Sequence, residues 1–199
     1  MKKILTTLCL TLTLLLGSIG NSESANFQKG LTAAFNGDYE TAMREWKPLA
    51  EQGHADAQYN LGFMYDKGRG VPQDYKTAVK WYKLSAEKGD ADAQTNLGFI
   101  YEKGLSVPQD YKVAVKWYRL SAEQGNADAQ YNLGLMYGTG LGVTQDNIYA
   151  HMWWSIAELS GNKNASENRT IVAKKMSSSQ IETAQKLARE CVSKKYKGC

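Results

Sequence analysis

The sequence has few of the residues that catalytic and metal sites need. It contains two histidines, His54 and His151, and neither has a partner at metal-ligand spacing. The H-E-x-x-H zinc motif, the P-loop and the G-x-S-x-G nucleophile elbow are all absent. We therefore expect neither an enzyme nor a metalloprotein, and we expect no cofactor.

Long apolar runs are also scarce. The one such run, Ile4–Leu16, has 13 residues and falls short of the roughly 20 that a transmembrane helix needs. Lys2 and Lys3 precede it and small or polar residues follow it, which is the pattern of a secretory signal peptide. We expect residues 1–25 to be cleaved from a bacterial protein that is periplasmic or secreted, with no membrane span in the mature chain.

Cysteine occurs only three times. Cys9 lies within the signal peptide, so export leaves Cys191 and Cys199, eight residues apart, in an oxidising compartment. We expect these two residues to form an intramolecular disulfide. Free thiols and an intermolecular link are the alternatives.

The chain also lacks a strong excess of either charge. Its 24 basic and 20 acidic residues give a net charge of +4, and loss of Lys2, Lys3 and Glu23 with the signal peptide leaves 22 against 19. We expect no nucleic-acid partner, because such proteins usually show a concentrated basic patch. Residues 163–197 hold nine basic and three acidic residues, which fits a solvated helix face or, as the alternative, a basic docking surface.

The chain is rich instead in internal repetition. The word VPQDYK begins at Val71 and again at Val107, 36 residues later. The two blocks that contain it match at 27 of 36 positions, and a third block opens in the same way before it diverges. A fixed period of this length is typical of stacked repeats. We expect a signal peptide at 1–25, a short N-terminal repeat at 26–54, three repeats at 55–90, 91–126 and 127–162, and a C-terminal helical cap at 163–199.

Each block divides into two helices. In the first block Ala57, Leu61 and Met64 recur at the spacing of one helix face. Gly68 then stands as a stop signal, and Asp74 is placed to cap the second helix. The recurrent word VPQDYK is therefore the joint between the two helices of a unit.

Glycine also stands inside the first helix of every block. Each of Gly62, Gly98 and Gly134 costs about 1 kcal/mol relative to alanine. We expect close packing against the second helix, with Ala78 and its equivalents in the matching role, to require them. In the short N-terminal unit, Pro48 falls within the second helix, and we expect it to kink or break that helix.

The repeated pattern A-D-A-Q-x-N-L-G-x-x-Y-x-x-G-x-x-V-P-Q-D-Y-x-x-A-x-x-W-Y resembles the Sel-one-like repeat, a relative of the tetratricopeptide repeat. The resemblance covers residues 37–162. It implies an all-α fold, a right-handed α-solenoid of antiparallel helix pairs, which we expect a C-terminal capping helix pair to close. It also implies a non-catalytic adaptor that binds another protein or peptide in the bacterial envelope or outside the cell.

A β-lactamase or penicillin-binding enzyme is the alternative, because a cysteine-rich branch of this family is associated with that activity. The repeats here contain no cysteine. Ser85–Lys88 matches the S-x-x-K word of penicillin-recognising enzymes. It lies at the end of a packing helix and reads SAEQ in the next block, so we interpret the match as coincidence.

We expect the partner to bind the first helices on the side opposite their buried stripe. Aromatic or apolar side chains recur there, accompanied by asparagines, and the family resemblance implies that asparagines at these positions hold a peptide on the concave face. The alternative is that the aromatics pack against the next repeat and the asparagines brace the backbone between units. The candidate residues are Tyr59, Asn60, Phe63, Lys67, Asn96, Phe99, Lys103, Tyr131, Asn132 and Leu135.

Overall fold

The computed structural model of the protein describes residues 23–199. Most of the predicted signal peptide lies outside these described residues. Within them, every regular element is a helix. The helices are an N-terminal helix at 23–35, α2 (Tyr39–Glu51), α3 (Ala55–Lys67), α4 (Tyr75–Glu87), α5 (Ala91–Lys103), α6 (Tyr111–Ala122), α7 (Ala127–Thr139), α8 (Asn147–Leu159), α9 (Ala165–Ala173) and α10 (Ser178–Ser193).

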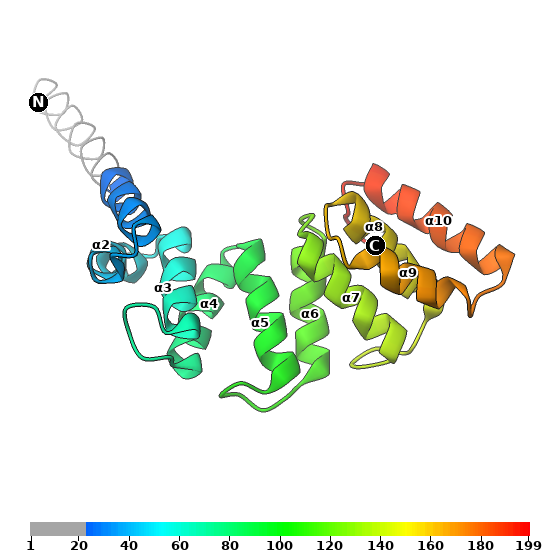
Figure 1. The fold of residues 1–199 in the computed structure, drawn as a ribbon, viewed down its shortest axis with the longest axis horizontal. Helices are drawn as coiled ribbons and strands as arrows, with labels where there is room; N and C mark the ends of the chain where they lie inside the picture. The colour runs from blue at the N-terminus through cyan, green and yellow to red at the C-terminus, as the bar shows by residue number, and fades with distance from the viewer. Residues whose placement is uncertain (1–22) are drawn as a thin grey trace, which may run out of the picture.

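Successive helices pack as antiparallel pairs, and the pairs stack side by side into an elongated arc (Figure 1). The predicted all-α solenoid is confirmed. None of the helices in the described part of the chain is both long and apolar enough to cross a bilayer.

The helices begin and end at the predicted residues because their caps are local. Asp74 caps α4 by accepting the backbone N–H of Thr77, and Asp110 and Asp146 cap α6 and α8 in the same way. Gly68 closes α3 in the left-handed conformation that glycine adopts without strain. His54 also has a capping role, since its Nδ1 accepts the N–H of Ala57 at 3.4 Å.

An aromatic ring lies on each glycine of the first helices. A Cβ added at Gly62 would stand 2.6 Å from the ring of Tyr82, and one added at Gly98 would stand 2.6 Å from the ring of Tyr118. The prediction that packing requires these glycines is confirmed. The neighbour is a ring of the second helix, however, and not the alanine that we expected, although Ala78 is fully buried.

The N-terminal unit repeats this arrangement. Gly30 of the N-terminal helix lies under the ring of Trp46 in α2, as Gly62 lies under Tyr82. The unit is therefore a complete helix pair with a shorter loop. The predicted break at Pro48 does not occur: α2 is helical as far as Glu51, because the buried residues Trp46, Leu49 and Ala50 pack its last turns against the core.

Side-chain hydrogen bonds join neighbouring units at the junction between one helix pair and the next. The side-chain amide of Gln94 donates to the Ala86 carbonyl at the end of the preceding helix, at 3.0 Å. Gln58 and Gln130 donate to the equivalent carbonyls. Each of these carbonyls also accepts the backbone N–H of the glycine three residues later, such as Gly89 for Ala86, so the glutamine adds a second hydrogen bond that ties the two units together.

The C-terminal cap begins in register with the repeats. Ala165 of α9 stands 36 residues after Ala129, and both side chains are fully buried. Helix α10 starts at a capping box formed by Ser177 and Gln180 and packs back against α8. The cap thus continues the stack by one helix and then closes it.

Candidate protein-binding face

An apolar side chain follows the packing glycine in each unit, on the side of the first helix opposite the buried stripe. Phe63, Phe99 and Leu135 follow Gly62 and its two equivalents, and Leu31 follows Gly30. In α9 the same register position holds Ile171. We call these five residues the apolar ladder: Leu31, Phe63, Phe99, Leu135 and Ile171.

Several members of the apolar ladder remain open to solvent. Leu31 is 37% exposed, Phe99 is 44% exposed and Ile171 is 48% exposed. Phe35, one turn after Leu31, is 92% exposed. Recurrent exposed apolar side chains on one face are typical of interaction sites.

Lysines flank the ladder in the first two blocks. The ammonium of Lys67 lies 5.9 Å from the ring centroid of Phe63, and that of Lys103 lies 5.7 Å from the centroid of Phe99. Each lysine also pairs with the preceding carboxylate, Asp66 at 3.0 Å and Glu102 at 2.5 Å. The lysines therefore cover the rings but add little net charge to the face.

The same carboxylates tie the face to the core. The hydroxyl of Tyr82 donates to Asp66 at 3.2 Å, and that of Tyr118 donates to Glu102 at 2.8 Å. Burial, and after it the adjacent carboxylate, raises the pKa of each tyrosine hydroxyl far above its usual value. Both tyrosines therefore remain neutral hydrogen-bond donors.

Two of the predicted tyrosines belong to the joints between units. Tyr59 packs against a cluster that contains Ala93 and Leu97 of the next unit, and burial, with Asp92 and Asp90, raises the pKa of its hydroxyl. The hydroxyl of Tyr131 accepts a hydrogen bond from Asn168 of α9 at 3.0 Å. Both tyrosines are partly buried, which favours the alternative that these aromatic side chains pack against the next repeat.

The predicted asparagines divide between the two roles. Asn96 lies near the Tyr59 hydroxyl of the preceding unit, where its side chain partly offsets the raised pKa of that group, and Asn168 of α9 donates a hydrogen bond to the Tyr131 hydroxyl of the unit before it. Both brace neighbouring units, as the alternative reading expects. Asn60, by contrast, lines a surface groove, and among residues 23–199 the side chains of Asn60 and Asn132 show no hydrogen bond.

The C-terminal part of the face is covered. Tyr131 and Leu135 pack against a cluster that contains Val172 of α9 and the adjoining Met176. The structure therefore leaves the predicted face open mainly over the N-terminal helix, α3 and α5. Phe63, Lys67, Phe99 and Lys103 of the predicted set lie in this open part.

A groove of about 300 Å³ forms the N-terminal end of the open face. Phe35, absent from the predicted set, is among its most exposed residues. Gly30 and Gly62 occupy equivalent positions, and this correspondence aligns the N-terminal helix with α3. From that alignment the sequence could have indicated that Leu31 and Phe35 belong to the binding face. The groove is lined by Leu31, Ala34, Phe35, Tyr39, Trp46, Asn60, Phe63, Met64 and Arg69.

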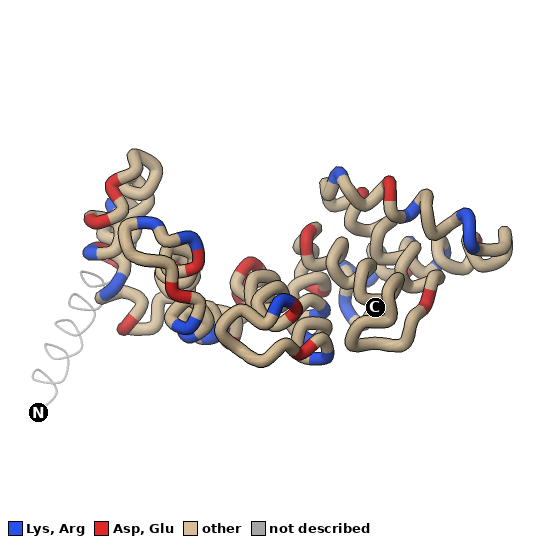
Figure 2. Tube along the Cα trace, turned by 60° about the horizontal axis from the view of Figure 1, so that its bottom comes forward, with Lys and Arg blue, Asp and Glu red and all other residues tan. Residues whose placement is uncertain are grey.

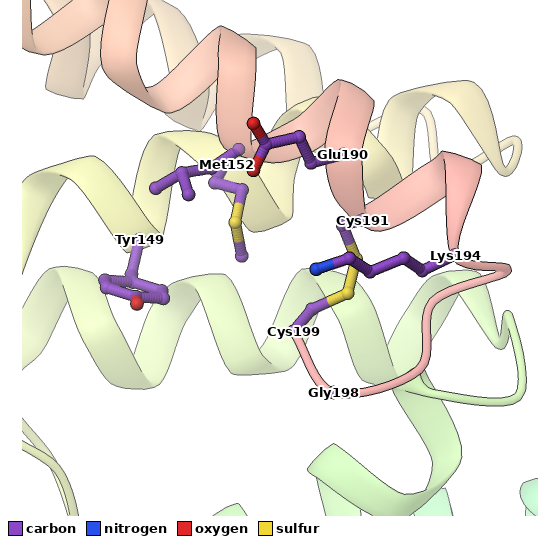
Figure 3. A pocket seen from close by; sticks show the side chains of 8 residues that line it. Tyr149, Met152, Glu190, Cys191, Lys194, Gly198 and Cys199 are labelled. Carbon is purple, nitrogen blue, oxygen red and sulfur yellow. A yellow bond between two sulfur atoms is a disulfide. The ribbon is translucent and has the colours of Figure 1, made fainter.

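The predicted cysteine pair is brought together at the other end of the molecule. The sulfur atoms of Cys191 and Cys199 lie at bonding distance, 2.07 Å, and the two Cα atoms are 5.6 Å apart. Figure 3 shows the pair beside a cavity of about 100 Å³, which Tyr149 and Met152 also line. This cavity holds little more than a few water molecules.

The side chains on which the enzyme alternative would depend, those of Ser85 and His151, are buried in packed helices. The Ser85 hydroxyl of the S-x-x-K word is fully buried and donates to the Ala55 carbonyl at 3.0 Å. Burial, with Arg169, lowers the pKa of His151, which is therefore a buried neutral residue. Among residues 23–199, no three His, Cys, Asp or Glu side chains gather as metal ligands.

Charged residues of both signs occur along the described chain (Figure 2). Basic residues outnumber acidic ones, nine to three, in the C-terminal stretch 163–197. The interpretation of these basic residues as solvated helix surface fits the exposure of Lys186, which pairs with Glu190 on α10.

A stack of helix pairs with a recurrent apolar face defines the class of α-solenoid repeat proteins. Within that class, the Sel1 repeat matches residues 55–90, 91–126 and 127–162, and the chain belongs to the Sel1 repeat family. Sel1 repeat proteins are generally protein-interaction scaffolds. The search of curated proteins gave no significant match.

The solved structures that are similar to the chain include two that are 29% identical to it. A Sel1 repeat protein from Oxalobacter formigenes is 29% identical with a TM-score of 0.71, over 87% of this chain and 75% of that one. A protective antigen of uropathogenic Escherichia coli, c5321, which displays an SLR fold, is 29% identical with a TM-score of 0.56. That match covers 92% of this chain and 49% of the antigen, so the chain spans about half of the antigen's length.

Proposed function

We propose that the protein is a non-catalytic scaffold that binds another protein along the open part of the apolar ladder. The observation that carries this proposal is the exposure of Phe35 and Phe99 on first helices of the stack, the N-terminal helix and α5. Aromatic side chains at interfaces contribute large buried areas with little loss of conformational entropy. A solitary folded domain gains nothing from exposing such side chains.

We also propose that the scaffold works in the bacterial envelope or outside the cell. The signal-peptide pattern of residues 1–25 supports export. The placement of Cys191 against Cys199 suits an oxidising compartment, and the similar E. coli protein is described as a protective antigen. Fusion of residues 1–30 to alkaline phosphatase tests export, because that enzyme becomes active only outside the cytoplasm.

Photo-crosslinking in cells tests the binding face. A photoreactive phenylalanine analogue placed at position 35 or 99 should crosslink the same partner, because both side chains lie on the apolar ladder's open side. The matched control is the analogue at Lys116, an exposed residue of the second helix α6. Crosslinks from position 116 alone, or none from 35 and 99, would contradict the proposal.

A further inference from the structure

The N-terminal groove differs from the rest of the face in its chemistry. Eight of its nine lining residues are uncharged, and the ninth is Arg69. No carboxylate lines it. A partner group that enters this groove therefore meets apolar walls, one amide at Asn60 and one positive charge.

Arg69 is oriented by two aromatic rings. Its guanidinium lies 5.0 Å from the centroid of Phe63 and 5.7 Å from that of Tyr39. Rings that contact the flat faces of a guanidinium leave the N–H groups at its edge free to donate. Among residues 23–199, no carboxylate lies within 4 Å of this guanidinium, whereas neighbouring Lys67 pairs with Asp66 at 3.0 Å.

The loop that carries Arg69 is fixed against the groove. Gly70 has φ +72°, and a Cβ at this residue would stand 2.6 Å from the Cβ of Tyr39. The loop is thus seated on the start of α2. The equivalent positions of the next two loops hold Leu105 and Leu141, so among the three repeats the charge is specific to the loop between α3 and α4.

Resting on the proposed function, we propose that this groove recognises a segment of the partner in which a bulky apolar residue stands beside an acidic one. The apolar side chain enters between Leu31, Phe35 and Phe63. The carboxylate accepts two hydrogen bonds from the edge of the Arg69 guanidinium, a geometry that arginine forms readily with carboxylates. The amide of Asn60 is placed to bond the peptide backbone.

Peptide display tests this specificity. The full exported protein is used to select from a random library of seven-residue peptides. We expect enrichment of Phe, Trp, Leu or Ile within two residues of Asp or Glu. Enriched sequences without an acidic preference, or no enrichment at all, would overturn the proposal, while crosslinking of a partner from position 99 would still support the scaffold.

Two variants of the protein test whether Arg69 is the residue responsible for the preference for acidic peptides. Arg69→Gln should keep the apolar preference and lose the acidic one, and Arg189→Gln removes the same charge from an exposed site on α10 as the control. For one enriched synthetic peptide, replacing its acid by the amide should weaken binding to the wild type about tenfold. The same replacement should leave binding to Arg69→Gln unchanged. An equal loss of affinity with both proteins would show that Arg69 does not bind the acidic side chain of the peptide.

Discussion

Single residues in this protein take their roles from their place in the repeat. The glycine of the first helix makes room for a ring, the aspartate of the loop caps the second helix, and the glutamine of ADAQ joins two units. Ser106 departs from its equivalents: Gly70 and Gly142 have φ +72° and +74°, and Ser106 adopts φ +57° at the same loop position. A side chain in this conformation is strained.

We expect Ser106→Gly to stabilise the protein. Relief of the left-handed strain contributes about 1–2 kcal/mol, and the greater freedom of glycine in the unfolded chain offsets about 0.5–1 kcal/mol of it. The net rise in the free energy of unfolding, about 0.5–1 kcal/mol, is measured by urea titration. Ser106→Ala, which keeps the Cβ, is the control and should show no such gain; a loss of stability in Ser106→Gly would contradict the argument.

Gly98→Ala should have the opposite effect. The new methyl group meets the ring of Tyr118, which is fully buried and cannot withdraw, and overpacking of this kind costs about 1–3 kcal/mol. Alanine's better helix propensity returns about 1 kcal/mol. Urea titration and far-ultraviolet circular dichroism should therefore show a helical but less stable protein. An unchanged midpoint would mean that the ring can move aside.

At the scale of elements, most of the fold could be predicted because its signals are local and repeated. Capping aspartates, stop glycines and the helical spacing of Ala57 and Leu61 recur in each block. The first helix of the N-terminal unit could not be recognised in this way, because its loop is shorter and Gly30 does not stand at the 36-residue interval.

Half of the candidate face could not be predicted for a similar reason. Whether Tyr59 faces solvent or the next unit depends on the angle between helix pairs, which no sequence period records. The covering of Leu135 by α9 and the stacking of Arg69 on two rings likewise arise from tertiary contacts. Phe99 and Lys103 could be placed correctly because they depend on the helix period alone.

The C-terminal element gives a prediction of its own. Cys191 is buried against the core, and the ring of Tyr196 in the intervening loop lies beside Gly125 at the turn between α6 and α7. We expect intact mass and alkylation of exported protein to show no free thiol before reduction. Reduction should then lower the free energy of unfolding by at most about 2.5 kcal/mol, the loop-entropy figure for eight residues. Alkylation of both cysteines before reduction would contradict the predicted disulfide.

At the scale of the whole molecule, the arc is asymmetric. Helices α9 and α10 cover its C-terminal end (Figure 1). Leu31, Phe35 and the groove lie at the other end of the described chain, on the N-terminal unit. Binding should therefore concentrate on the N-terminal half of the apolar ladder. The second helices also expose leucines, Leu84 at 42% and Leu120 at 40%, which provide a matched comparison for the role of the ladder.

The affinity of two double variants for the crosslinked partner tests the central claim most directly. Phe35→Ser with Phe99→Ser removes two exposed aromatic side chains from the first helices, and Leu84→Ser with Leu120→Ser removes two exposed leucines from the second helices. Each pair should leave helical content unchanged, because the side chains are substantially exposed. We expect the first pair to weaken binding at least tenfold, about 1.4 kcal/mol or more, and the second to leave it unchanged. Unaltered binding by the first pair, or a greater loss in the second, would show that the partner binds elsewhere.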